Sequence, residues 1–274
     1  MRTQKRMVVC LIAGVALLAV SATAAFGSIT GYSQYKDSVI TLALEEENFA
    51  ALANCALTLD GETKMEARLD YVQDGPDRSM HVTGSQWGVP METWDVTVDG
   101  VSTWFSGDDQ EYYHQGMRED PPSTFLTINA DDEYQARVLN FLNVACDTVV
   151  GDLKNNFVQI GTQEGVALYQ VDIGADQVPA LVSAGLSLLA VSQEGTEEDL
   201  LQVCREDLAL ENIHCTFAID HEGRLVNTQV KLSFLGTDDQ GNTHPLVMTG
   251  DVAVSDYGTA VVQPVDVGDR VLYQ

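Results

Sequence analysis

Apolar and polar residues alternate along much of the chain, which predicts antiparallel strands with one apolar face. Residues 49–59 form the first such strand, and a turn follows at Asp60-Gly61. A three-residue loop over 60–62 would pair Leu57 with Met65 and Cys55 with Ala67, so that the apolar sets of both strands share a face. A third strand is expected at 80–87, after the break at Asp74-Gly75-Pro76.

The clearest hairpin spans residues 92–105, because Asp99-Gly100 between two valines favours a type I′ turn. A two-residue turn places Asp95 and Trp104 on one face. The opposite face, which we expect to point inward, carries the larger apolar set of Trp94, Val96, Val98, Val101 and Phe105. A short edge strand is expected near 111–114.

The last third of the chain predicts a three-stranded meander over 213–219, 226–234 and 246–254. A four-residue loop at 221–224 would pair Phe217 with Thr228 and Cys215 with Val230. A shorter hairpin, 156–160 with 166–173, turns at Glu164-Gly165. These strands also have one apolar face each.

Apolar residues at helical spacing predict four amphipathic helices, at 31–47, 132–149, 176–189 and 196–208. Three acidic residues at 45–47 oppose the helix dipole, so the first helix should end there and a strand should begin at Asn48. Sheets that are apolar on one side need a cover, and these helices are the candidates. The pattern therefore predicts a single α+β domain.

The N-terminus predicts export. Arg2, Lys5 and Arg6 precede an uncharged, largely apolar run of 21 residues at 7–27. This length suits an uncleaved signal anchor, which we favour, whereas Ala22-Thr23-Ala24 would suit cleavage of a signal peptide. Residues 1–28 are thus a signal anchor or signal peptide, and 29–274 a single extracellular domain with the N-terminus cytoplasmic. The expected location is the cell membrane, or the medium if the signal is cleaved.

The charge balance excludes several partners. The 274 residues hold 14 Lys and Arg against 41 Asp and Glu, for a net charge of −27. Without residues 1–27 the basic count falls to 11 and the net charge becomes −30. Such acidity argues against nucleic-acid binding and against docking on anionic lipid. With 45% hydrophobic residues, the chain still has enough apolar side chains for a core.

No arrangement of residues predicts catalysis, a metal site or a cofactor. The chain has no Gly-x-Ser-x-Gly, and its five histidines lack metal-ligand spacing. The acidic loop at 237–242 lacks the spacing of a calcium loop and is interpreted as a turn. We therefore expect a protein that is not an enzyme. Cys55, Cys146, Cys204 and Cys215 fit either free core thiols or one or two disulfides.

The order of elements resembles the bacterial LolA-like and LppX/LprG-like exported proteins over about residues 30–258. The strands NFAALANCALTLDG and WDVTVDGVSTWF precede a helical middle third, and IHCTFAIDHEGRLVNTQVKLSF follows it. The resemblance implies a curved antiparallel sheet, or half-barrel, whose apolar face is covered by helices and which carries lipids or lipidated proteins. This chain lacks the lipobox that many of those proteins have.

The leading hypothesis is a membrane-anchored extracellular protein that binds a lipophilic ligand or lipidated partner in an apolar cleft. Its expected lining is Trp94, Phe105, Phe217 and Phe234, because apolar area holds such ligands. Trp104, on the opposite face, would mark a partner surface. The alternative hypothesis is a surface interaction or sensor domain with a closed core and no small ligand.

Overall fold

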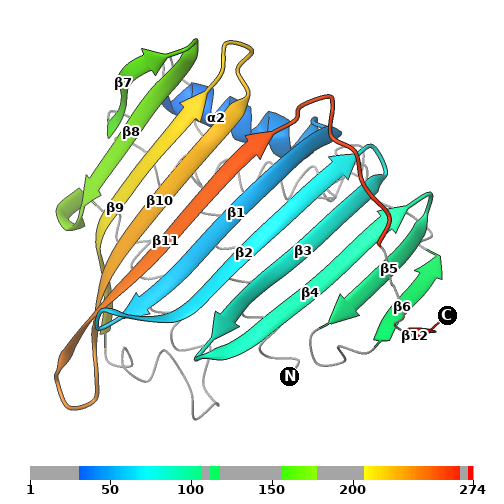
Figure 1. Cartoon of the computed structure of the whole chain (residues 1–274). Coiled ribbons are helices and arrows are strands. Elements are labelled where there is room, and N and C mark those ends of the chain that lie inside the picture. Colours follow the sequence, from blue (N-terminus) through cyan, green and yellow to red (C-terminus); the bar gives the residue numbers. More distant parts are fainter. Residues whose placement is uncertain (1–30, 107–111, 118–155, 178–206, 266–270, 274) are drawn as a thin grey trace, which may run out of the picture.

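A computed structural model describes residues 31–106, 112–117, 156–177, 207–265 and 271–273, which form a sheet of twelve strands with helix α2 (Gly31–Leu44) on one side (Figure 1). The strands are β1 (Asn48–Leu59), β2 (Glu62–Asp74), β3 (Asp77–Gln86), β4 (Val89–Val98), β5 (Val101–Ser106), β6 (Tyr112–Met117), β7 (Phe157–Gln163), β8 (Val166–Gly174), β9 (Asp207–Ile219), β10 (Leu225–Thr237), β11 (Thr243–Ser255) and β12 (Val271–Tyr273). A 3₁₀ turn, η3 (Ala175–Gln177), follows β8.

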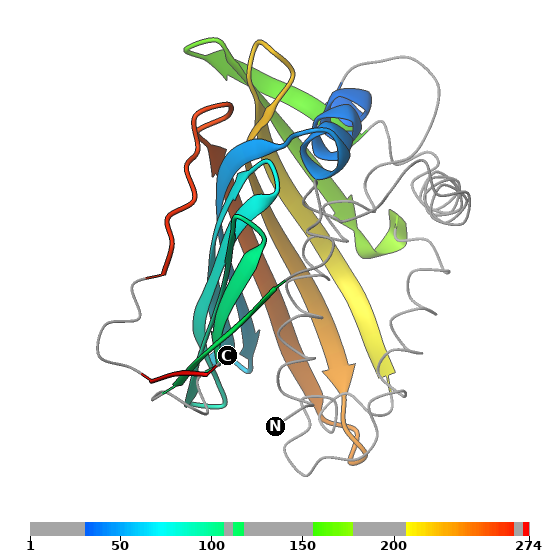
Figure 2. The same ribbon diagram turned by 90° about the vertical axis from the view of Figure 1, so that its right-hand side faces the viewer.

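The sheet is curved and open, as the half-barrel expectation required. Its strand order is β12-β6-β5-β4-β3-β2-β1-β11-β10-β9-β8-β7, so β12 and β7 are the two edges. Figure 2 shows the sheet bending around the side that carries α2. One pair departs from the antiparallel expectation, because β12 runs parallel to β6.

Helix α2 ends at Leu44, immediately before the three glutamates, and β1 begins at Asn48, as predicted. The other predicted helices and the signal segment at 1–28 lie outside the described residues, with two exceptions. Residues 175–177 form η3, and Leu208, expected at the end of a helix, belongs to β9. No helix in the described part of the chain is long and apolar enough to cross a bilayer.

Tight turns set the register of the long hairpins. Asp60 and Gly61 have φ angles of 52° and 83°, so β1 and β2 are joined by a two-residue turn rather than the predicted three-residue loop. The predicted pairs Leu57–Met65 and Cys55–Ala67 nevertheless form, because a bulge between Leu57 and Thr58 shifts the register by one residue.

The β9–β10 pairs Phe217–Thr228 and Cys215–Val230 are also as predicted. The β7–β8 hairpin turns at Glu164-Gly165, where both residues have positive φ angles. Alternation together with turn residues therefore predicted these pairs, but not the bulge between Leu225 and Asn227 through which β9 and β10 reach their register.

Helix α2 defines two faces of the sheet. The Tyr35 ring packs on Phe217 of β9, with ring centroids 4.3 Å apart. We call the face that carries Phe217 the inner face and the opposite one the outer face. Register and alternation extend the inner face to Leu57 of β1, Leu69 of β2 and Phe234 of β10, all of which are buried.

The segment after β11 crosses the outer face at the ends of β2, β3 and β4 (Figures 1 and 2). Asn48, the first residue of β1, holds this segment at Ala260: its Nδ2 donates to Ala260 O at 3.0 Å, and its Oδ1 accepts from Ala260 N at 2.8 Å. Gly258 N also donates to Asn48 O at 2.9 Å. Ala260 and Val262 are buried as a result of this placement.

We expect Asn48→Ala to lower the free energy of unfolding by about 1–2 kcal/mol, because the amide of Ala260 loses a partner and its carbonyl a donor. Urea denaturation followed by far-UV circular dichroism measures the change. Asn54→Ala is the matched control on the same strand: Asn54 is exposed and makes one long bond, 3.4 Å to Asp251. We expect this control to cost less than about 0.5 kcal/mol. Equal losses in the two variants would contradict the anchoring role of Asn48.

Candidate ligand-binding site

The inner face holds the largest group of buried apolar side chains among the described residues. It runs across β1, β2, β3, β9, β10 and β11, with members such as Phe49, Leu57, Met65, Val82, Leu232, Phe234 and Leu246. Helix α2 packs at one end of this face, against β7, β9 and β10. The apolar surface therefore extends well beyond the strands that α2 covers.

A closed aromatic cluster lies beneath α2. Phe217 stacks on Tyr169 with ring centroids 4.8 Å apart and planes at 7°, and it also contacts Tyr35 and Phe157. Tyr35 Oη lies 3.3 Å from Thr228 Oγ1, within hydrogen-bonding distance, and burial raises the pKa of Tyr35. Every side chain here except the half-buried Phe157 is buried, so this end of the inner face is a packed core.

Two inner-face cysteines are free thiols. Cys55 is half-buried in β1, and Cys215 is buried beside Thr228, with Sγ and Oγ1 3.8 Å apart. Burial raises the pKa of both thiols, that of Cys215 to about 11. Cys146 and Cys204 lie outside the described residues. Cys55 and Cys215 therefore act as small core residues, one of the two alternatives that the sequence left open.

The four residues predicted to line a cleft are not brought together. Phe217 and Phe234 lie on the inner face, in separate packed clusters. Trp94 lies on the outer face. Its ring stacks on that of His81, with centroids 4.7 Å apart, and its Nε1 donates a hydrogen bond of 3.4 Å to Ser79 Oγ. Phe105 is the register partner of Trp94, so its position is also on the outer face. The expectation that all four point inward is wrong for these two.

The reason is that the opposite face of β4 and β5 points inward, which hydrophobic patterning alone does not reveal. The predicted β4–β5 pairing is present, but two-residue turns at Gly75-Pro76 and Trp87-Gly88 set which face points inward. When residues are paired outward from these turns, one row that crosses the strands on the inner face contains Tyr71, Met80, Asp95 and Trp104. This count was available from the sequence, and it identifies Asp95 and Trp104 as the inner-face residues that hydrophobic patterning missed.

The inner face therefore becomes more polar at β4 and β5. Thr97 is fully buried there, and its Oγ1 lies 2.7 Å from Ser102 Oγ, within hydrogen-bonding distance. Asp95 is half-buried, its Oδ1 is shielded from solvent, and no residue in the described part of the chain hydrogen-bonds to that oxygen. Burial raises the pKa of Asp95. Trp104 is 40% exposed, whereas the side chains of the apolar centre are buried.

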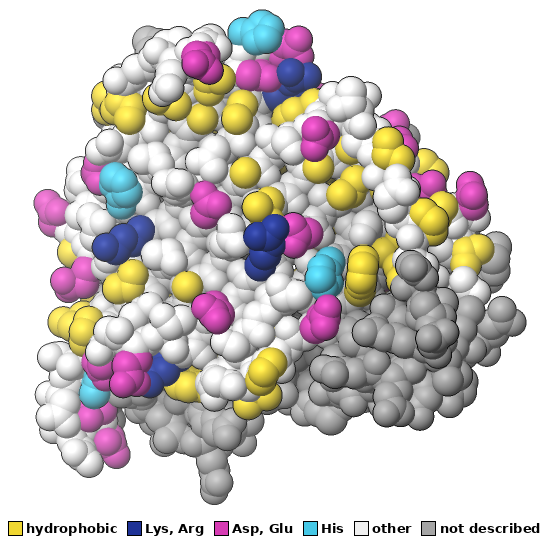
Figure 3. Space-filling model, in the orientation of Figure 1, with side chains coloured by type: hydrophobic (Ala, Val, Ile, Leu, Met, Phe, Trp, Pro, Cys, Tyr) yellow, Lys and Arg dark blue, Asp and Glu magenta, His cyan; other side chains and the backbone are white. Residues whose placement is uncertain are grey.

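The outer face is polar, and Figure 3 shows its charged and apolar side chains scattered over it. A hollow of about 590 Å³ lies at mid-sheet among outward side chains of β1, β2, β10 and β11. Two of its charged groups already have partners: Arg68 donates two bonds of 2.9 Å to the Asp70 carboxylate, and Asp251 accepts from Asn54, Asn227 and Gln229. Because these side chains hydrogen-bond to one another, the hollow is a weaker candidate than the inner face.

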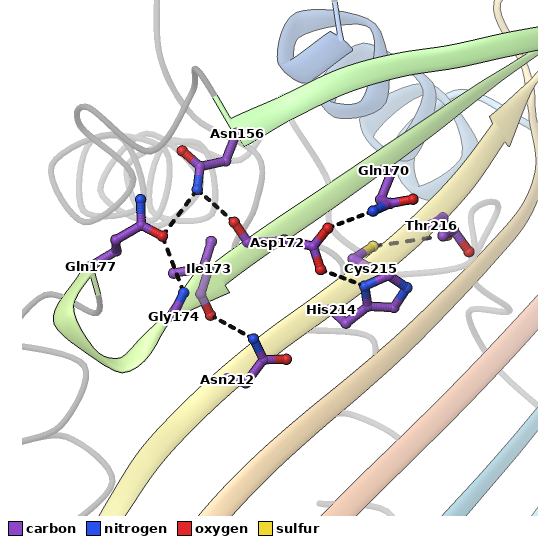
Figure 4. A network of polar contacts seen from close by, with 10 residues as sticks. All are labelled: Asn156, Gln170, Asp172, Ile173, Gly174, Gln177, Asn212, His214, Cys215 and Thr216. Atoms are coloured by element: carbon purple, nitrogen blue, oxygen red, sulfur yellow. Dashed lines mark hydrogen bonds and ion pairs between the residues drawn. The ribbon is translucent and has the colours of Figure 1, made fainter.

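A second polar network lies where β8 meets β9 (Figure 4). Asp172 lies 2.6 Å from His214 Nδ1 and accepts from Gln170 Nε2 at 2.5 Å, and these two bonds lower its pKa. Gln177 of η3 accepts from Gly174 N and from Asn156. The polar groups satisfy one another and fix the end of β8, which is a structural role.

The acidic loop after β10 is a turn, as predicted. Asp238 accepts from the backbone amides of Gln240 and Asn242 and from the Asn242 side chain, and these bonds lower its pKa to about 2. His244 lies between Asp60 Oδ2 at 2.9 Å and Asp238 Oδ2 at 3.4 Å, which raises the pKa of His244. No group of three metal-ligating side chains occurs within the described ranges.

His244 predicts a pH-dependent contribution to stability. Its pKa is higher in the folded chain than its unfolded value of about 6.5, so the protonated ring stabilises the fold below that value, and the contribution is lost as pH rises through the folded pKa. We expect His244→Gln to destabilise the chain more at pH 5.5 than at pH 9, measured by urea denaturation. His221→Gln is the control, because that side chain is 77% exposed. A pH-independent difference for His244→Gln would contradict the ion pairs.

Comparisons with known proteins assign neither a family nor a function. No family model matches the chain, and no curated protein matches it. Among solved structures, it is similar to a LolA superfamily protein from Nitrosomonas europaea, at 8% sequence identity and a TM-score of 0.24, over 87% of this chain and 96% of that one. Membership of the LolA-like group therefore stays a prediction.

Proposed function

We propose that this chain is a membrane-anchored extracellular protein, not an enzyme, that binds a lipophilic ligand or the acyl part of a lipidated partner on the inner face of its sheet. One observation carries the proposal: the apolar inner face spans β1, β2, β3 and β9–β11, whereas α2 packs mainly at one end of it, against β7, β9 and β10. A buried apolar face of this extent that α2 covers only in part suits an acyl chain, because apolar area dominates the affinity for such ligands.

A transverse row of small side chains supports the same face. The row crosses four adjacent strands, and each residue in it is the register partner of the next: Gly84 of β3, Ala67 of β2, Cys55 of β1 and Gly250 of β11. Larger residues flank the row, such as Leu57 and Met65 on one side. An extended acyl chain lying along the row would meet few bulky side chains.

The test is photo-crosslinking in cells that express the full chain. Cells are fed a fatty acid with a diazirine on its acyl chain and irradiated, and the adducts are mapped by mass spectrometry. We expect adducts on inner-face residues of β1, β2, β10 and β11. Adducts restricted to residues 1–28 would contradict the proposal and favour the closed-core interaction domain.

Topology is tested separately. A C-terminal tag should be labelled by an impermeant reagent on intact cells, because the basic residues before the apolar run keep the N-terminus cytoplasmic. Labelling only after the cells are permeabilised would contradict the extracellular placement. A chain that remains with the membrane after carbonate washing is anchored, whereas release into the medium indicates signal cleavage.

A further inference from the structure

The inner face carries one carboxylate whose placement the core does not explain. Asp95 lies between two polar neighbours of its own strand, Thr93 and Thr97, and its register partners are Met80 of β3 and Trp104 of β5. Its Oδ1 is shielded from solvent and has no hydrogen-bond donor among the described residues. A half-buried carboxylate without a partner destabilises the fold that contains it, so its presence calls for a ligand group that compensates the charge.

The nearest basic residue along this face does not supply that charge. Arg78 lies two residues before Met80 on β3, and its register partner is Thr97. In the described part of the chain Arg78 forms no ion pair with Asp95, whose raised pKa reflects burial alone. The carboxylate is therefore available to an external cation.

Trp104 adds the second recognition element. As the direct cross-strand partner of Asp95, its side chain starts about 5 Å away at Cβ. The ring reaches over β6, where a Cβ added at Gly116 would lie 3.6 Å from its six-membered ring. The side chain is 40% exposed, so ligand can reach it. A carboxylate beside an accessible indole is a recognised arrangement for organic cations, which gain from both the ion pair and the cation–π contact.

We infer that the ligand of the inner face is an amphiphile with a cationic ammonium head, which binds between Asp95 and Trp104 while its acyl chain lies on the apolar centre of the sheet. This inference rests on the proposed function and adds the chemistry of the head group. The charge of the chain agrees with it: with a net charge of −27 the protein attracts cations and repels anionic amphiphiles.

The test uses the full chain held in amphipol and three photoreactive probes with the same sixteen-carbon diazirine chain, ending in trimethylammonium, hydroxyl or carboxylate. Labelling of inner-face peptides is quantified by mass spectrometry at equal probe concentration. We expect the ammonium probe to label at least 5-fold more than the hydroxyl probe, and the carboxylate probe to label least. In Asp95→Asn the ammonium preference should fall to within 2-fold.

Matched variants separate the site from the general acidity of the chain. Asp70→Asn removes an outer-face carboxylate of β2, and Trp94→Leu removes an outer-face indole of β4, the strand that carries Asp95. Both should keep the ammonium preference, whereas Trp104→Leu should reduce it. Asp95→Asn should also melt no lower than the parent chain, because it removes an unpaired charge rather than a contact.

Each outcome decides one proposal. Absence of inner-face labelling by every probe overturns the proposed function. Equal labelling by all three probes leaves the proposed function intact and overturns the cationic head group. An ammonium preference that persists in Asp95→Asn shows attraction by overall charge and likewise overturns the site. Loss of the preference in Asp95→Asn and Trp104→Leu, but not in the outer-face variants, supports it.

Discussion

Phe217→Ala should lower the free energy of unfolding by about 3–5 kcal/mol, one of the two largest effects that we expect in this chain. Phe217 is 2% exposed and is enclosed by Tyr35 of α2, Tyr169 of β8 and Phe157 of β7. Removing its ring would leave a cavity between the helix and the sheet. It would also remove the stacking partner of Tyr169, whose hydroxyl hydrogen-bonds to Gln34 of α2.

Urea denaturation followed by tryptophan fluorescence measures this loss. Phe217→Leu keeps part of the volume and should cost less than half as much. Val158→Ala, at an apolar position of β7 that is 53% exposed, should cost less than about 1 kcal/mol. A cost below about 1 kcal/mol for Phe217→Ala would show that the cluster is loosely packed. Phe217 would then be a candidate for lining a ligand cleft, as the sequence suggested.

Registers could be predicted from the sequence, because each is determined locally. Asp99-Gly100 and Glu164-Gly165 demand positive φ angles at both turn positions, and this fixes the strands on either side. The bulge at Thr58 was not predictable in the same way. It satisfies both a two-residue turn and the pairing of apolar faces, and either a bulge or a longer loop meets that requirement.

The candidate site was harder to predict, because which face of β4 and β5 points inward depends on the whole sheet rather than on one hairpin. On β4 the outer face holds Trp94 and Val96, and Val96 is 2% exposed, so apolar character did not distinguish inside from outside. The segment after β11 accounts for this at one end, since it crosses the outer face and buries Ala260 and Val262 there. Alternation within one hairpin cannot reveal a cover supplied by residues about 160 positions away.

Because Asp95 and Trp104 point inward, the inner face is polar at one end. One register row joins Tyr71 to Trp104 through Met80 and Asp95, and it leads from the packed apolar centre to the half-buried Asp95 and the 40% exposed Trp104. A surface with this gradient matches an amphiphile better than a purely apolar molecule, because the polar end offers a place where a head group stays solvated. The same face with Trp94 and Phe105 inward would have been apolar throughout.

Gly84→Ala should destabilise the chain by about 2–3 kcal/mol, because the strand backbones approach too closely at this position for a side chain. A Cβ added to Gly84 would overlap the carbonyl oxygen of Glu66 and lie 2.9 Å from Ala67 Cα. Both obstacles are backbone atoms of the paired strand β2, so relief requires β2 and β3 to move apart. The small-residue row of the inner face crosses the sheet at the same point.

Gly161→Ala is the matched control, since Gly161 also lies in a strand and an added Cβ there would meet nothing within 4 Å. Replacing this glycine should be neutral or should stabilise the fold by up to about 1 kcal/mol, because alanine restricts the unfolded chain. Thermal and urea denaturation of the two variants, compared with the parent chain, give both numbers. Similar stabilities for Gly84→Ala and Gly161→Ala would contradict the close approach of β2 and β3. If Gly84→Ala is destabilised as expected, lipid crosslinking of that variant shows whether the same row positions the acyl chain.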